Sequence, residues 1–126
     1  MNNEIIPIQL TANKVNKKWG HEIHLCNNDE FCGKILKFNK NSQFSMHFHV
    51  KKREVFFLLY GKIMLSWIDY TNSKKYERIF HESDVIEIPR LVNHQITALE
   101  ETLIIEFSTT DYPDDSYRVM AGDSQK

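Results

Sequence analysis

The sequence predicts an all-β domain, a sandwich or a barrel, and three observations carry that prediction. Short apolar-rich runs alternate with polar turn segments from Trp19 onward. The runs are rich in β-branched and aromatic residues and too short for independent helices, as at 55–59. Many short strands at such spacing are typical of sandwiches and barrels. The length of 126 residues fits one domain, 1–126, that can bury an apolar core.

Polar turn signals separate the successive strands along the chain. The expected strands span residues 22–25, 33–38, 43–49, 54–60, 62–69, 75–80, 84–88, 94–98 and 102–108. The turns are rich in Asn, Asp and Ser, and Gly61 supplies the tight turn after 54–60. Residues 1–16 are expected to form an N-terminal arm and about 19–109 the core. The C-terminal tail, 110–126, is expected to pack irregularly or stay mobile.

Composition excludes several classes of function. The net charge is −1, from 16 basic and 17 acidic residues, without the basic excess of a nucleic-acid binder. No apolar run approaches the ~20 residues of a membrane span. The first residues resemble no secretory signal, so we expect a cytoplasmic protein without a membrane partner. Cys26 and Cys32 match no zinc or redox spacing and are expected to be free thiols.

A histidine pair followed by a glutamate predicts a metal site. His47 and His49 are two residues apart, so on a strand both imidazoles project from one face. After a short loop, Glu54 opens the next strand and can face the same space. Nitrogen donors with one carboxylate oxygen suit a divalent transition metal, and Mn, Fe, Co, Ni and Zn all stay open. The His-x-His pair alone is weak evidence, and Glu54 and Gly61 behind it make the pattern specific.

A second segment supplies a fourth ligand candidate. His94 follows a strand and a turn led by Pro89, and it opens the next strand. Each of these histidines alone would more often be structural, and only the combination favours a metal. His21, His24 and His81 have no ligand-like spacing and are expected to be surface or packing residues.

The first of these segments resembles a motif of the cupin family. That motif, Gly-x5-His-x-His-x3-4-Glu-x6-Gly, matches at His47, His49, Glu54 and Gly61, with Asn41 in place of the leading Gly. The resemblance implies a double-stranded β-helix, the jelly-roll barrel of cupins, with one divalent transition metal held inside it.

The second cupin motif, Gly-x5-Pro-x-Gly-x2-His-x3-Asn, is matched less fully. Pro89 and His94 agree with it, whereas Ser83, Leu91 and Ala98 replace the usual Gly, Gly and Asn. The departures affect turn residues, and the ligand position is intact. The resemblance therefore implies a metal held by three histidines and one glutamate.

A narrower resemblance concerns substrate. The segments 19–22, 45–54 and 106–109, together with Lys34, look like small stand-alone cupins of bacterial surface-polysaccharide gene sets. Those cupins are similar to the C-terminal domain of type II mannose-6-phosphate isomerases. The resemblance implies a small-molecule substrate, a sugar or a sugar phosphate, although one fold hosts many functions.

The reaction that these residues suggest is aldose–ketose isomerisation with the metal as a Lewis acid. Glu106 is the candidate general base, ahead of Glu87, and Lys34 would orient substrate oxygens. Two alternatives stay open: a non-catalytic module that binds a metal and a small ligand, and a metal-dependent dioxygenase. Lys52, Arg53 and Arg90 are candidates for capturing an anionic group at the barrel mouth, or they are solvated loop residues.

Strand alternation also predicts a homodimer. If the ligands point inward, apolar side chains of the same two strands point outward and form an exposed patch. These side chains are Phe44, Met46, Phe48, Val55, Phe57 and Leu59. A second copy would bury part of this patch, unless the N-terminal arm covers it.

Overall fold

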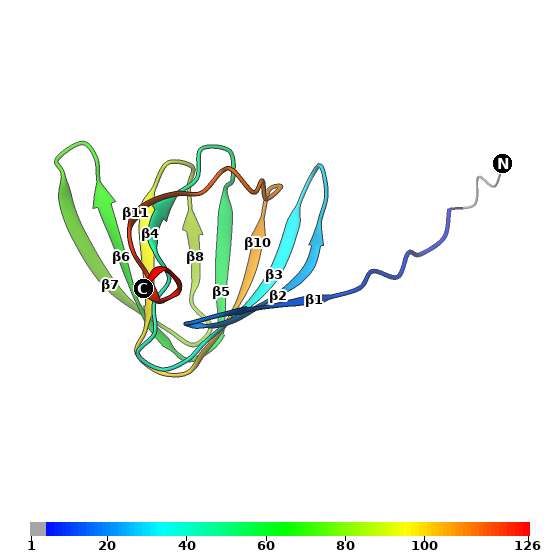
Figure 1. Cartoon of the computed structure of the whole chain (residues 1–126), viewed down its shortest axis with the longest axis horizontal. Helices are drawn as coiled ribbons and strands as arrows, with labels where there is room; N and C mark the ends of the chain where they lie inside the picture. Colours follow the sequence, from blue (N-terminus) through cyan, green and yellow to red (C-terminus); the bar gives the residue numbers. More distant parts are fainter. Residues whose placement is uncertain (1–4) are drawn as a thin grey trace.

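A computed structural model describes residues 5–126, and its strands form two antiparallel sheets that face each other (Figure 1). The first sheet has the order β1 (Asn13–Lys17), β2 (Gly20–Asn27), β3 (Cys32–Phe38), β10 (Thr102–Ser108), β5 (Glu54–Tyr60) and β8 (Val85–Ile88). The second has the order β11 (Tyr117–Met120), β4 (Met46–Phe48), β9 (Asn93–Ala98), β6 (Lys62–Asp69) and β7 (Lys74–His81). A short 3-10 helix, η1 (Asp123–Gln125), follows β11. The all-β, jelly-roll prediction is confirmed.

The core lies between the sheets and is built from side chains two residues apart. Phe56 and Leu58 of β5 and Leu36 and Phe38 of β3 point inward from the first sheet. Ile63 and Leu65 of β6 and Ile96 and Ala98 of β9 meet them from the second. This is the period-2 alternation that the sequence predicts for half-buried strands.

On four strands the inward-facing side chains are polar at one end and apolar at the other, and this positions the functional site. On β3 the row reads Lys34, Leu36, Phe38; on β5, Glu54, Phe56, Leu58; on β9, His94, Ile96, Ala98; and on β10, Ile104 precedes Glu106. All of these side chains are buried. One end of the barrel is therefore filled by hydrocarbon, and the other end collects polar groups.

Two strands lie outside the predicted set. β1 overlaps the end of the expected N-terminal arm, 1–16. Its sequence, Asn-Lys-Val-Asn-Lys, shows no apolar alternation, and it forms because it pairs with β2 along its whole length. Likewise, β11 lies in the tail and pairs with β4. Residues 5–12 form no strand and run away from the barrel (Figure 1). Residues 1–4 of the predicted arm lie outside the described part of the chain.

The predicted strand 43–49 is shorter than expected, and the outward position predicted for Phe44 is wrong. Only Met46–Phe48 is regular strand, so alternation does not extend back to Phe44. Phe44 turns inward, with its ring 6.3 Å from that of Trp19 and 5.8 Å from that of Phe38. Met46 is fully buried, and Phe48 stacks on Tyr117 of β11. On β5, Val55 and Phe57 are half-buried and Leu59 is exposed.

Cys26 and Cys32 are free, as the sequence predicts. Among the described residues, no helix has the length and apolar character needed to cross a membrane.

Gly61 occupies a position where the fold should not tolerate a side chain. It joins β5 to β6 with φ +106°, and an added Cβ would lie 2.2 Å from Thr102 Oγ1 and 2.6 Å from Thr102 Cα. Gly61→Ala is therefore expected to lower the free energy of unfolding by on the order of 3 kcal/mol, through a strained φ and overpacking. Urea denaturation measures this loss.

Gly33→Ala is the matched control. Its Cβ would meet Cys26 Sγ at 3.5 Å, an ordinary contact, and its backbone is in strand conformation. We expect a change within about 0.5 kcal/mol. Equal losses from the two variants would contradict the role given to Gly61.

Candidate metal centre

Three imidazoles converge at the polar end of the barrel. His47 lies on β4 and His94 is the second residue of β9, and the two residues are direct partners across the strand pair. His49 follows β4 on the same side as His47, as their spacing predicts. One ring nitrogen from each histidine lies within 4.8 Å of the others. The three histidines could therefore bind a single metal ion.

Backbone carbonyls fix the tautomer of each ring. His47 Nδ1 lies 2.7 Å from the carbonyl oxygen of Ser45, and His94 Nδ1 lies 2.8 Å from that of Val92. His49 Nδ1 lies 2.8 Å from the carbonyl oxygen of Asp115. A carbonyl only accepts, so each Nδ1 carries the proton and donates it. In a neutral ring this leaves the Nε2 lone pair free, which is how metal-binding histidines are commonly held.

Burial keeps the rings of His47 and His49 neutral. Burial, together with the neighbouring His94 and His49 rings, lowers the pKa of His47 to about 3. Burial also lowers the pKa of His49. Neutral imidazoles are the form that ligates a metal, so these two are ready to bind at any pH near neutrality.

The atoms at the centre of the cluster lack partners among the described residues. His49 Nε2, His94 Nε2 and Glu54 Oε2 are all buried and form no hydrogen bond. Glu54 Oε2 lies 3.2 Å from His94 Nε2 and 3.5 Å from His49 Nε2. Acceptors that face each other in a buried space are costly unless a cation lies between them. The residues present therefore fit a metal ion.

Glu54 is held as a carboxylate in spite of its burial. Burial opposes the charged form, but the Lys52 ammonium favours it and keeps the pKa of Glu54 below its usual range. Lys52 Nζ lies 3.5 Å from Glu54 Oε1. One carboxylate oxygen thus faces the lysine and the other faces the imidazoles.

Lys52 also joins Glu54 to a second buried carboxyl group. Its Nζ lies 3.4 Å from Glu106 Oε2 and 3.5 Å from Asp111 Oδ1. Burial opposes the ammonium form, but these carboxylates outweigh it and raise the pKa of Lys52. For Glu106, burial raises the pKa to about 7, and the Glu54 charge adds to this effect against the opposing Lys52. Glu106 is therefore a carboxyl group that changes protonation near neutral pH.

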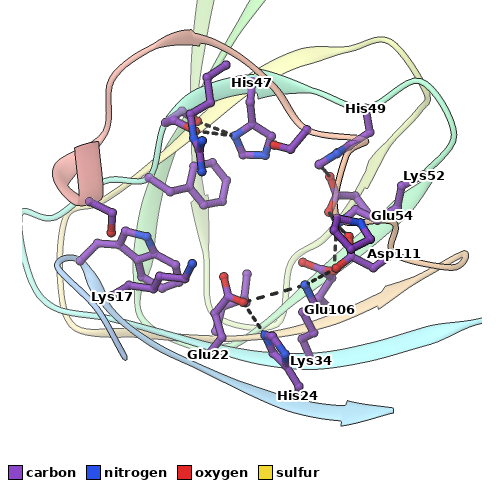
Figure 2. A pocket seen from close by; sticks show the side chains of 18 of the residues that line it. Lys17, Glu22, His24, Lys34, His47, His49, Lys52, Glu54, Glu106 and Asp111 are labelled. Carbon is purple, nitrogen blue, oxygen red and sulfur yellow. Dashed lines mark hydrogen bonds and ion pairs between the residues drawn. The ribbon is translucent and has the colours of Figure 1, made fainter. Parts of the chain in front are cut away.

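A chain of ion pairs continues this wall across β3 and β2 (Figure 2). Lys34 pairs with Glu106 in the β3–β10 register, and its Nζ lies 3.0 Å from Asp111 Oδ2 and 3.9 Å from Glu22 Oε1. Glu22 Oε1 in turn lies 2.7 Å from His24 Nε2. His24, expected to be a surface or packing residue, lines the pocket because it lies opposite Lys34 in the β2–β3 register.

These groups surround a cavity of about 270 Å³. Its lining includes Trp19, Leu36 and Phe44 from the barrel and Asp111, Tyr112 and Arg118 from the C-terminal tail. Seven predicted site residues are brought together: His47, His49, Glu54, His94, Lys34, Lys52 and Glu106. The fully buried His94 does not itself line the cavity.

The structure does not bring Arg53 and Arg90 to the pocket. Arg53 is exposed and forms an ion pair with Glu87 on the outside of the barrel. Arg90 donates from Nε to the carbonyl oxygen of Lys51, at 2.8 Å. For Arg53 the reason is the alternation of side chains around the start of β5. Lys52 shares the inward face with Glu54, whereas Arg53 shares the outward face with Val55.

The fold and this cluster define a β-barrel protein with a site that could hold a metal. The sequence profile of the cupin family matches residues 24–121, and the chain belongs to that family. The predicted resemblance to cupins is confirmed. No curated protein matches the chain in sequence.

Solved structures of low sequence identity share the fold. Oxalate decarboxylase from Bacillus subtilis has a TM-score of 0.74 at 16% identity, over 86% of this chain and 30% of that chain. CapF from Staphylococcus aureus, a capsular polysaccharide assembling protein, has a TM-score of 0.78 at 15% identity, over 90% and 33%. KdgF from Halomonas sp. has a TM-score of 0.67 at 15% identity, over 81% and 89%. The chain thus spans about a third of the length of the first two.

Asp115 is a site residue that the sequence pattern did not reveal. Its buried carboxylate accepts hydrogen bonds from the backbone N–H groups of Val50, Lys51 and Lys52, at 2.9–3.1 Å. Its own carbonyl accepts from His49, as described above. One residue of the tail therefore fixes both a ring of the histidine cluster and the loop that carries Lys52. No local motif marks it, because the partners of its carboxylate and of its carbonyl all lie more than 60 positions earlier.

Asp115→Ala should loosen this loop. Three buried or half-buried N–H groups would lose a charged acceptor, so we expect the free energy of unfolding to fall by on the order of 3 kcal/mol. Limited proteolysis should also cut the tail faster. Asp114→Ala is the control, because Asp114 is exposed. Equal behaviour of the two variants would show that Asp115 does not anchor the tail.

Proposed function

We propose that this cupin is a metal-dependent isomerase of a sugar or sugar phosphate, with its metal held by His47, His49, Glu54 and His94. The observation that carries this proposal is Glu106, a buried carboxyl group with a pKa of about 7 in the pocket beside the histidines. Lys52 contacts both Glu106 and Glu54, so the candidate base and the candidate ligand belong to one cluster.

The donor set supports a divalent transition metal. Three imidazole nitrogens and one carboxylate oxygen accept Mn, Fe, Co, Ni or Zn, and availability often decides between them. When bound, such a metal supplies Lewis acidity that polarises a carbonyl oxygen.

The protein side chains would then handle the proton. Aldose–ketose isomerisation moves one proton between adjacent carbons and one from a hydroxyl to the carbonyl oxygen, so it needs no further reactant. Glu106 would take the proton from the first carbon and return it to the second, because its pKa lies near the working pH of a general base. Lys52 and Lys34, on either side of Glu106, would orient substrate oxygens. The CapF neighbour, described as assembling capsular polysaccharide, agrees with carbohydrate chemistry.

A non-catalytic module that binds a metal and a small ligand is the second candidate. It is favoured by the engagement of Lys34 and Lys52 in ion pairs, which leaves the wall around Glu106 neutralised before any substrate arrives. The homodimer, the cytoplasmic location and the single-domain organisation stay predictions, as does dioxygenase chemistry.

Metal content tests the ligand set. Protein purified without a His-tag should retain about one divalent ion per chain, measured by elemental analysis. His49→Ala should weaken metal binding by at least about 100-fold in competition with a chelator, because it removes a direct ligand. His81→Ala is the control, since His81 is exposed on β7. Equal metal content in the two variants would rule out the site.

Glu106→Gln tests the general base. We expect kcat/KM on the substrate identified from a panel of sugars and sugar phosphates to fall by about 100- to 10,000-fold with metal content unchanged. In the wild type, kcat/KM should rise with pH through about 7, because only the carboxylate form accepts a proton. The variant should lose this rise. Glu87→Gln, on the exposed surface, is the control.

Full metal content without turnover across the panel would favour the binding module. An active Glu106→Gln variant with an unchanged pH profile would assign the base to another residue.

A further inference from the structure

The charged groups that line the cavity are unequally paired. Four cationic side chains and four carboxylates line it, and the carboxylates are those of Glu22, Glu54, Glu106 and Asp111. Lys34 and Lys52 form ion pairs with all four of these carboxylates. Lys17 and Arg118, in contrast, form no ion pair with any residue in 5–126. Two cations of the lining are thus left without a counter-charge.

Arg118 is directed to the metal centre by strand register. It lies on β11 directly opposite His47 of β4. Direct partners in an antiparallel pair project from the same face of the sheet, so the Arg118 side chain rises beside His47. An anion held by Arg118 would therefore belong to a molecule that also reaches the histidine cluster.

Lys17 approaches from the other sheet. It ends β1, and Figure 2 shows its side chain on the side of the pocket away from Lys52 and Asp111. The backbone N–H of the next residue, Lys18, donates to Ser124 Oγ at 3.1 Å, and Lys18 Nζ donates to the carbonyl oxygen of Lys126 at 2.8 Å. These bonds tie the end of β1 to the C-terminal helix η1.

The same helix adds two neutral donors to the lining, Ser124 and Gln125. Ser124 Oγ accepts from Lys18, and Gln125 Oε1 accepts from the Gly122 N–H at 2.9 Å. The Ser124 hydroxyl hydrogen and the Gln125 amide hydrogens have no acceptor among the described residues. The part of the pocket formed by β1 and the tail is therefore rich in donors.

The charge balance selects a dianion. Four cations against four carboxylates make the lining formally neutral, and a divalent metal at the histidines would give it a charge of +2. A phosphate monoester carries about −1.5 to −2 at pH 7, whereas a carboxylate carries only −1. Guanidinium groups also bind phosphate oxygens through two parallel hydrogen bonds.

We propose that Lys17 and Arg118 form an anion subsite that binds the phosphate monoester of the substrate, with Ser124 and Gln125 as additional donors. The subsite narrows the proposed function, on which it rests, from sugars in general to sugar phosphates. It also replaces Arg53 and Arg90, which the sequence suggested for this role, with residues from the two ends of the chain.

Binding of inorganic phosphate to metal-free protein tests the subsite directly. The protein is stripped of metal and dialysed into low salt, and phosphate is titrated by calorimetry. The double variant Lys17→Gln/Arg118→Gln should bind phosphate at least about tenfold more weakly than the wild type, because it loses two charge-assisted contacts. Arg53→Gln should bind like the wild type. Equal affinities of the double variant and the wild type would overturn the proposal.

The single variant Lys17→Gln controls for detachment of β11, which the Arg118 change in the double variant could cause. It leaves β11 unchanged. We expect it to weaken phosphate binding by about threefold or more with an unchanged melting temperature. An unchanged affinity in this variant would remove Lys17 from the subsite and overturn the proposal as stated.

A second experiment identifies which kind of anionic sugar the subsite binds. A hexose 6-phosphate, a hexuronate and a neutral hexose are titrated into the metal-loaded protein. The phosphate ester should bind tightest, and only its affinity should fall strongly in the double variant. A hexuronate that binds as tightly and loses as much would assign the subsite to carboxylates instead. Phosphate binding through these residues without any isomerase activity would keep the subsite and overturn the proposed function, so the two failures are distinguishable.

Discussion

The buried carboxylate of Glu54 is the constraint on which the rest of the structure depends. A charge this far from water is costly unless it is paired, and Lys52, His49 and His94 are the groups that surround it. Glu54 cannot move outward, because its strand has a period of two and a slip of one residue would expose Phe56 and Leu58. The register that builds the hydrophobic core therefore also forces a carboxylate against two imidazoles, and a cation bound between them would relieve the conflict.

The same coupling explains why one barrel has two ends of different chemistry. The inward-facing side chains of one strand include both apolar and polar residues. Packing of the apolar residues therefore holds the strand, and with it the polar residues at the other end. His94 is oriented by a strand whose next inward residues, Ile96 and Ala98, are fully buried. A site built on such strands keeps its ring positions without needing support from the ion itself, which is the arrangement that precise metal geometry requires.

The residues that sequence alone could identify are those whose geometry is local. The pair His47 and His49 follows from strand alternation, and nearly all of the strands fall at their predicted positions. Counting back from Glu54 in steps of two also puts Lys52 on the inward face and Arg53 on the outward face. The sequence does not show this plainly, because both residues lie in the loop between β4 and β5. Asp115 and Arg118 act through contacts with residues more than 60 positions away, and no periodicity records such a pairing. Strand alternation places Phe44 wrongly on the outward face, because regular strand begins only at Met46.

The barrel and the C-terminal tail contribute different groups to the pocket. The barrel rows place the imidazoles, Glu54 and Glu106, which determine what chemistry the pocket can support. The tail contributes Asp111 to the lysine cluster, Asp115 to the loop that carries Lys52, and Arg118 beside His47. Because the carbonyl of Asp115 holds the His49 ring, docking of the tail favours the ring orientation that leaves Nε2 free. By linkage, whatever binds at Nε2 must favour the docked tail to the same degree. The segment that would select an anionic substrate is thus energetically coupled to the site that would act on it.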